Sequence, residues 1–199
     1  TLAFAHEGFI DELAVKAKAD PMAFRLQMLP KESSTRNILE KLKEVSGWDK
    51  PLPAGSGRGV AQYEFFAGQC GYVVQVSQKG AGVKIDKVYA VIDLGTVVNP
   101  DTVKAQVQGA AVMALTAAIK GGITFQNGQT VQNNFNNNPL VRINEMPEVE
   151  VHILTDSGER IRGVGEPGVP SFAPALCNAI FAATGKRIRK LPFDINKIA

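Results

Sequence analysis

Residues 59–94 read GVAQYEFFAGQCGYVVQVSQKGAGVKIDKVYAVIDL, a stretch rich in Val, Ile, Tyr and Phe. Residues of these types favour β-strands, and their grouping predicts three strands, over 59–66, 72–78 and 83–94. Residues 79–82 (KGAG) form the turn between the last two predicted strands. Because connections this short join antiparallel neighbours, we expect an antiparallel sheet.

The residues before this stretch predict helices. Over residues 1–50 the apolar side chains recur at helical spacing and indicate three helices. Asp20 followed by Pro21 is typical of an N-cap and the first helical position. Ser33 or Ser34 can cap the third helix.

Further elements are expected after the strands. Asn99 and Pro100 predict the start of another helix. Its expected buried face consists of Val103, Val107, Ala110, Ala111, Ala114 and Ala117. Asn127-Gly128 predicts a hairpin turn within the polar surface loop 126–138, and the alternation over 148–154 predicts a strand with its valines facing the core.

The expected fold class is α+β, with an antiparallel sheet and helices packed on it. Residues 51–58 are rich in Pro, Gly and Ser and predict a linker. The predicted division is a helical segment (1–50), the linker (51–58) and an α+β portion (59–199).

Residues 162–170 read RGVGEPGVP, and a helical pattern follows them. Its apolar positions are Val169, Phe172, Ala173, Leu176, Ile180 and Ala183, with Gly185 as the C-terminal cap residue. Glu166 lies between glycines and prolines that fix the backbone, just before the expected helix start. The helix dipole would keep this carboxylate ionised and able to accept a proton. The alternative is that Glu166 only caps the helix.

Composition restricts the possible functions. The formal net charge of +3 is too small to indicate nucleic-acid binding. The sequence contains no apolar run of the roughly 20 residues that a membrane span requires. Two cysteines, Cys70 and Cys177, are too few for a disulfide framework or an iron–sulfur cluster. Cys177 is expected in the core, and Cys70 is expected to be buried or half-exposed. The two histidines have no metal-ligand spacing, so we expect no metal ligand in this chain.

The chain opens at Thr1, inside a helical pattern, and shows no targeting signal. We therefore expect a processed, nicked or truncated polypeptide, for which both the periplasm and the cytoplasm remain open.

The segments GVGEPGVP (163–170), APA (173–175), NAI (178–180) and GKRIR (185–189) resemble the end of the large subunit of molybdenum hydroxylases, the xanthine dehydrogenase and aldehyde oxidase family. The resemblance is greatest to the isoquinoline 1-oxidoreductase beta-subunit branch, and it extends to residues 4–29 and 93–112. It implies that Glu166 is the catalytic base beside the molybdenum. It also implies that backbone groups of Gly163, Val164 and Gly165 contact the pterin or the molybdenum ligands.

The resemblance implies a function for the assembled enzyme. Such enzymes use a molybdopterin cofactor, here expected in a dinucleotide form, to hydroxylate an aldehyde or an N-heteroaromatic carbon with water. The remaining large-subunit polypeptide and an iron–sulfur subunit would be partners, and the chain alone would be inactive. The alternatives are a non-catalytic remnant or structural module of such a complex, and a globular domain in which Glu166 has no chemical role.

Overall fold

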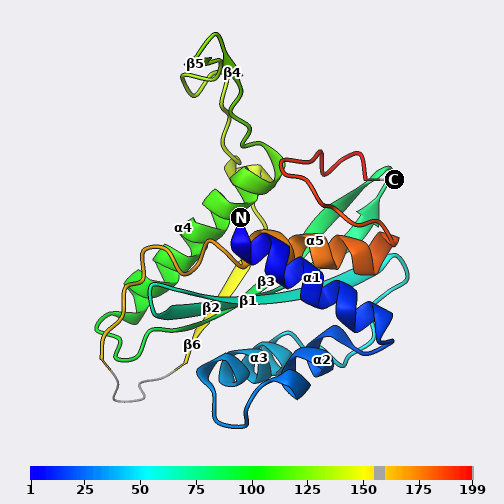
Figure 1. Cartoon of the computed structure of the whole chain (residues 1–199), viewed down its shortest axis with the longest axis vertical. Helices are drawn as coiled ribbons and strands as arrows, with labels where there is room; N and C mark the ends of the chain where they lie inside the picture. The colour runs from blue at the N-terminus through cyan, green and yellow to red at the C-terminus, as the bar shows by residue number, and fades with distance from the viewer. Residues whose placement is uncertain (155–159, 199) are drawn as a thin grey trace.

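A computed structural model describes residues 1–154 and 160–198. Its centre is a four-stranded sheet in the order β1-β2-β3-β6, with helices on both faces (Figure 1). Strands β1 (Ser56–Phe65), β2 (Gly68–Lys79) and β3 (Gly82–Asp93) are consecutive antiparallel neighbours, so the three predicted strands and their pairing are confirmed.

Strand β1 begins at Ser56, inside the predicted linker 51–58. The reason is tertiary, because Gly57 and Gly59 lie directly beneath a helix. A Cβ atom at Gly59 would be 2.1 Å from the backbone nitrogen of Ala179. The division into a helical segment and an α+β portion stays a prediction.

The fourth strand, β6 (Val149–Ile153), runs parallel to β3, so the sheet is mixed and the expectation of a purely antiparallel sheet is wrong in this respect. Parallel neighbours require a long crossover connection. Here the crossover contains helix α4 and a projecting hairpin. The alternation over 148–154 is confirmed, because Val149, Val151 and Ile153 pack on the larger core.

Helices α1 (Leu2–Lys16), α2 (Pro21–Met28) and α3 (Ser34–Val45) confirm the three predicted helices. The side chains of Asp20 and Ser33 accept hydrogen bonds from the first turns of α2 and α3, as N-caps do. Helices α2 and α3 cover one face of the sheet (Figure 1). The core on that face consists of Met22, Ile38, Leu39, Leu42, Val60, Val73 and Val91.

The other face carries α4 (Pro100–Ile119) and α5 (Phe172–Thr184), which enclose the larger core. The predicted cap of α4 is confirmed, since the Asn99 side chain accepts hydrogen bonds from the amides of Asp101 and Thr102. The prediction that Ala117 faces the core is wrong: Ala117 is exposed, whereas Ala118 is buried and its carbonyl accepts a hydrogen bond from the Phe193 amide of the C-terminal segment at 3.0 Å.

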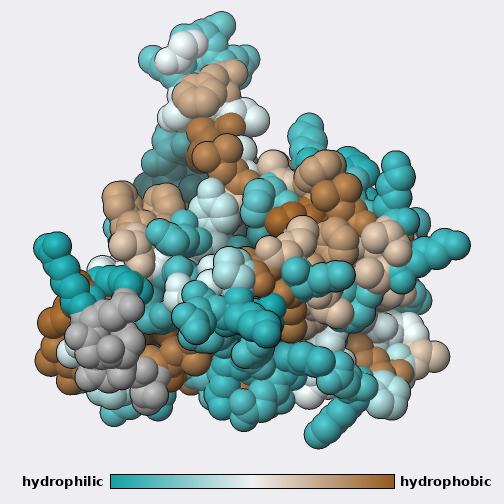
Figure 2. All heavy atoms as spheres, turned by 60° about the horizontal axis from the view of Figure 1, so that its bottom comes forward, coloured by the Kyte–Doolittle hydropathy of each residue, from teal (hydrophilic) through white to brown (hydrophobic). Residues whose placement is uncertain are grey.

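The crossover projects from the body as a hairpin, β4 (Phe125–Gln126) and β5 (Gln129–Thr130), ahead of the short helix η1 (Ile143–Glu145). Asn127 and Gly128 adopt positive φ angles of 50° and 77°, which confirms the predicted hairpin turn. Figure 2 shows hydrophilic and hydrophobic residues mixed on this projection. Among the described residues, no helix is both long enough and apolar enough to cross a membrane.

Candidate functional site

The segment that carries Glu166, residues 163–171, is called the Glu166 turn below. It enters beside the end of β3, where the Arg162 amide donates to the Leu94 carbonyl at 3.0 Å. The Arg162 guanidinium lies 3.8 Å from the Asp93 carboxylate at the same place. The Glu166 turn therefore begins beside the C-terminal end of β3, and the chain continues from it into α5.

Pro167 and Gly168 of the Glu166 turn are buried by close contacts with β2 and α4. Pro167 packs against Gly68, where a Cβ atom would lie only 2.6 Å from the proline ring. A Cβ at Gly168 would lie 2.7 Å from that of Ala110 on α4. No larger residue fits at Gly68 or Gly168 without moving its neighbours, so the glycines place the turn between β2 and α4.

Hydrogen bonds complete this placement. The Tyr72 hydroxyl donates to the carbonyl of Gly168 at 2.9 Å, and the Gln106 side-chain amide donates to the carbonyl of Gly165 at 2.9 Å. The Ser171 hydroxyl, which is fully buried, donates to the carbonyl of Cys70 at 2.8 Å. Tyr72 lies in the predicted strand 72–78 and Gln106 in the predicted helix, and no local sequence signal links either of them to Glu166.

Glu166 itself is exposed, at the outer end of the turn. Helix α5 begins at Phe172 with Ser171 as its N-cap, so Glu166 lies more than one helical turn before the helix. Two expectations are therefore wrong: Glu166 does not cap the helix, and the helix dipole does not act on it, because that effect is confined to the first turn. The Val169 amide instead donates to the Glu166 carbonyl at 3.0 Å, which closes the turn behind the carboxylate.

The backbone ahead of Glu166 fits a cofactor that accepts hydrogen bonds. Gly163 and Gly165 are exposed, and apart from their chain neighbours no atom of residues 1–154 and 160–198 lies within 4 Å of the Cβ position of either residue. Within the described part of the chain, no hydrogen bond uses the amides of Gly163, Val164 or Gly165. Exposed backbone amides without an internal partner can donate hydrogen bonds to the oxygens of a ligand. Pterin and phosphate oxygens are such acceptors, so these residues fit a molybdopterin group.

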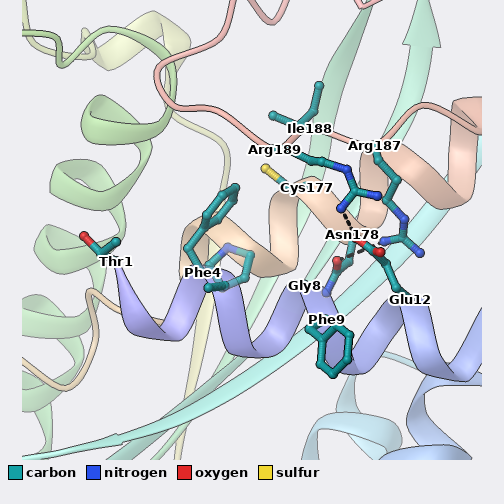
Figure 3. A pocket seen from close by; sticks show the side chains of 12 residues that line it. Thr1, Phe4, Gly8, Phe9, Glu12, Cys177, Asn178, Arg187, Ile188 and Arg189 are labelled. Atoms are coloured by element: carbon teal, nitrogen blue, oxygen red, sulfur yellow. Dashed lines mark hydrogen bonds and ion pairs between the residues drawn. The ribbon is translucent and has the colours of Figure 1, made fainter.

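A cavity of about 450 Å³ lies elsewhere, between α1 and α5 (Figure 3). Its apolar lining includes Phe4, Phe9 and Ile188, and its far end carries the Arg189–Glu12 ion pair. None of its lining residues belongs to the Glu166 turn. Because size alone says nothing about chemistry, the exposed turn remains the better candidate site.

The cysteines and histidines take no part in this site. Burial raises the pKa of the Cys70 thiol and of the Cys177 thiol to about 12, so both are protonated and inert. The expected burial of Cys177 is confirmed, and Cys70 is buried rather than half-exposed. Across residues 1–154 and 160–198, no group of three or more His, Cys, Asp or Glu side chains is arranged to hold a metal ion.

Comparison with known proteins identifies the family. Residues 11–147 match the family model of the molybdopterin cofactor-binding domain. This match covers well over half of the sequence, and the chain belongs to that family. The family resemblance inferred from the sequence is thereby confirmed. Since the match ends before Gly163, the roles assigned to the Glu166 turn stay predictions.

Two curated relatives match nearly the whole chain. The membrane-bound aldehyde dehydrogenase (pyrroloquinoline-quinone) of Gluconacetobacter polyoxogenes is 33% identical over 94% of this chain and 27% of its own length. The isoquinoline 1-oxidoreductase subunit beta of Brevundimonas diminuta is 29% identical over 95% of this chain and 25% of its own length. The chain thus spans about a quarter of the length of these relatives.

The fold also matches a solved structure. The aldehyde oxidoreductase from Desulfovibrio gigas superposes with a TM-score of 0.77 over 98% of this chain and 40% of its own, at 13% sequence identity. At this identity the match shows the fold alone. It confirms the predicted class, a mixed helix-and-sheet fold of the molybdopterin-binding type.

Proposed function

We propose that this chain forms one wall of the active site of a molybdenum hydroxylase and contributes its general base, Glu166. The substrate class is an aldehyde or an N-heteroaromatic compound. The net reaction adds one oxygen atom from water to the substrate carbon and releases two protons and two electrons. The observation that carries the proposal is the exposed Glu166 carboxylate on a turn whose backbone is fixed by β2 and α4.

In this proposal the chain's own residues have two roles, to bind the cofactor and to accept a proton. The amides of Gly163, Val164 and Gly165 donate hydrogen bonds to the cofactor, and the open space that the described residues leave at Gly163 and Gly165 permits its close approach. Glu166 accepts the proton that water loses on attack, a contribution typically worth about 10²–10⁴-fold in rate. When bound, the molybdenum cofactor supplies activation of water and a two-electron acceptor.

The proposed enzyme is an assembly. Relatives are about four times as long as this chain, so we infer that the remaining large-subunit polypeptide supplies the other walls of the site. An iron–sulfur subunit would remove the electrons, and the pterin would be in a dinucleotide form. The exposed Glu166 turn supports this view, because a base open to bulk solvent lacks the water-excluding surroundings that strengthen electrostatic catalysis. The chain alone is therefore expected to be inactive.

The test is Glu166→Gln in the assembled protein, with Glu148→Gln, another exposed glutamate, as the matched control. Turnover of benzaldehyde and of isoquinoline with a dye acceptor is expected to fall at least about 10²-fold for Glu166→Gln. Molybdenum content and assembly should not change, and Glu148→Gln should behave as the wild type. Unchanged turnover in Glu166→Gln would refute the base role and favour a structural module.

A further inference from the structure

Two side chains from outside the Glu166 turn donate hydrogen bonds to carbonyl groups on either side of Glu166. Gln106 of α4 bonds the Gly165 carbonyl, and Tyr72 of β2 bonds the Gly168 carbonyl, each at 2.9 Å. The Gly165 carbonyl belongs to the peptide unit that leads directly to the Glu166 Cα atom. We propose that Gln106 and Tyr72 are positioning residues that fix the Glu166 carboxylate for proton transfer. This inference rests on the proposed function.

Tyr72 is well suited to fix the backbone after Glu166. It is fully buried, and its ring packs edge-to-face on Phe172, with centroids 5.3 Å apart at 81°. Its hydroxyl has a single proton and lies 2.9 Å from the Gly168 carbonyl but 3.5 Å from that of Val107, so the bond to Gly168 is the stronger one. Burial raises the pKa of Tyr72 well above its usual value, and the hydroxyl therefore remains a donor at every working pH.

Gln106 fixes the backbone before Glu166 from a helix that is itself rigid. Val103 and Val107, on either side of Gln106 in α4, are buried. Gln106 is exposed and adds nothing to the core, so ordering its side chain has an entropic cost that its single bond to Gly165 must offset. Replacing this exposed side chain therefore removes its hydrogen bond to the turn without removing any packing from the core.

The experiment uses Gln106→Met and Tyr72→Phe in the assembled, cofactor-loaded protein. Each variant keeps the approximate size of the side chain and removes the donor. Gln78→Met is the matched control, because Gln78 also donates to a backbone carbonyl, that of Ala183, at 2.7 Å at the far end of α5. Tyr89→Phe, on the neighbouring strand, is the control for Tyr72→Phe.

A misplaced carboxylate reduces the rate without weakening substrate binding. We expect kcat with benzaldehyde or isoquinoline to fall by about ten- to a hundredfold in Gln106→Met and Tyr72→Phe, with KM and molybdenum content unchanged. The loss should disappear when either change is combined with Glu166→Gln, because the positioned group is then absent. If the substitutions instead disturbed the structure in general, the double variants would show the kcat losses of both single variants multiplied together.

A second measurement does not depend on turnover. The Val169 amide bonds the Glu166 carbonyl, so its hydrogen exchange reports how firmly the turn is held. Exchange should be several-fold faster in Gln106→Met and Tyr72→Phe than in the two controls. Unchanged kcat and exchange in both variants would overturn the positioning role and leave the proposed function standing. Full turnover in Glu166→Gln would overturn both.

Discussion

Gly59→Ala is expected to disturb the packing of α5 on the sheet, because α5 crosses β1 directly over this glycine. A Cβ atom at position 59 would lie 2.1 Å from the Ala179 nitrogen and 2.3 Å from the Ala175 carbonyl oxygen. Non-bonded heavy atoms prefer about 3.5–4.0 Å, so α5 would have to move outward by roughly 1 Å or more. The obstructing atoms are helix backbone, which cannot rotate away as a side chain could.

The size of the effect follows from this geometry. Overpacking typically costs about 1–3 kcal/mol, and a clash with backbone belongs at the upper end of that range. A loss of about 3 kcal/mol corresponds to roughly a hundredfold faster exchange of the α5 amides, since about 1.4 kcal/mol is a factor of ten. Hydrogen-exchange mass spectrometry of the polypeptide that contains this chain measures the change directly.

Gly109→Ala provides the control for Gly59→Ala. Gly109 lies within α4, and no atom is found within 4 Å of its Cβ position. Alanine is the better helix former by about 1 kcal/mol, so exchange in α4 should become slower. If Gly59→Ala left the exchange of α5 within about threefold of the wild type, less than 1 kcal/mol, the account of α5 packing would be refuted.

Two further predictions concern buried groups. Arg25→Met leaves the buried Glu7 carboxylate without its guanidinium partner, and α1 should lose about 3–5 kcal/mol of protection against exchange. Lys41→Met, at an exposed ion pair, should cost less than about 1 kcal/mol, and equal losses would contradict the reasoning. With pKa values of about 12, Cys70 and Cys177 carry almost no thiolate at pH 8. Iodoacetamide should therefore modify the two thiols only after denaturation, and rapid modification of the native protein would contradict their burial.

Local signals made much of the fold predictable. β-branched and aromatic runs predicted β1, β2 and β3, since a pleated surface favours such residues. Asp20 and Asn99 predicted helix starts because their side chains bond neighbouring amides. The Asn127-Gly128 turn was predictable because both residues tolerate positive φ.

Features that depend on distant contacts were not predictable. The parallel pairing of β6 depends on the path of the crossover, and no short sequence pattern encodes it. In α1 the apolar Phe9 is 60% exposed, whereas Glu7 and Asp11 are buried. The two carboxylates are tolerated there because Arg25 and Arg187 pair with them from other parts of the chain.

The candidate site divides in the same way. The sequence marked Glu166 through its glycine and proline neighbours, which act on the local backbone. The residues that hold the turn could not be predicted, because Tyr72 bonds Gly168 across 96 residues of sequence and Gln106 bonds Gly165 across 59. The exposure of Glu166 was also unforeseen, because the sequence pattern placed the start of α5 too close to it.

The most direct test of the central claim is anomalous diffraction at the molybdenum edge from crystals of the assembled, cofactor-loaded protein. The account predicts a molybdenum peak beside the Glu166 carboxylate, with the cofactor bound along the amides of Gly163, Val164 and Gly165. A molybdenum atom bound elsewhere, with the Glu166 turn facing bulk solvent, would contradict it.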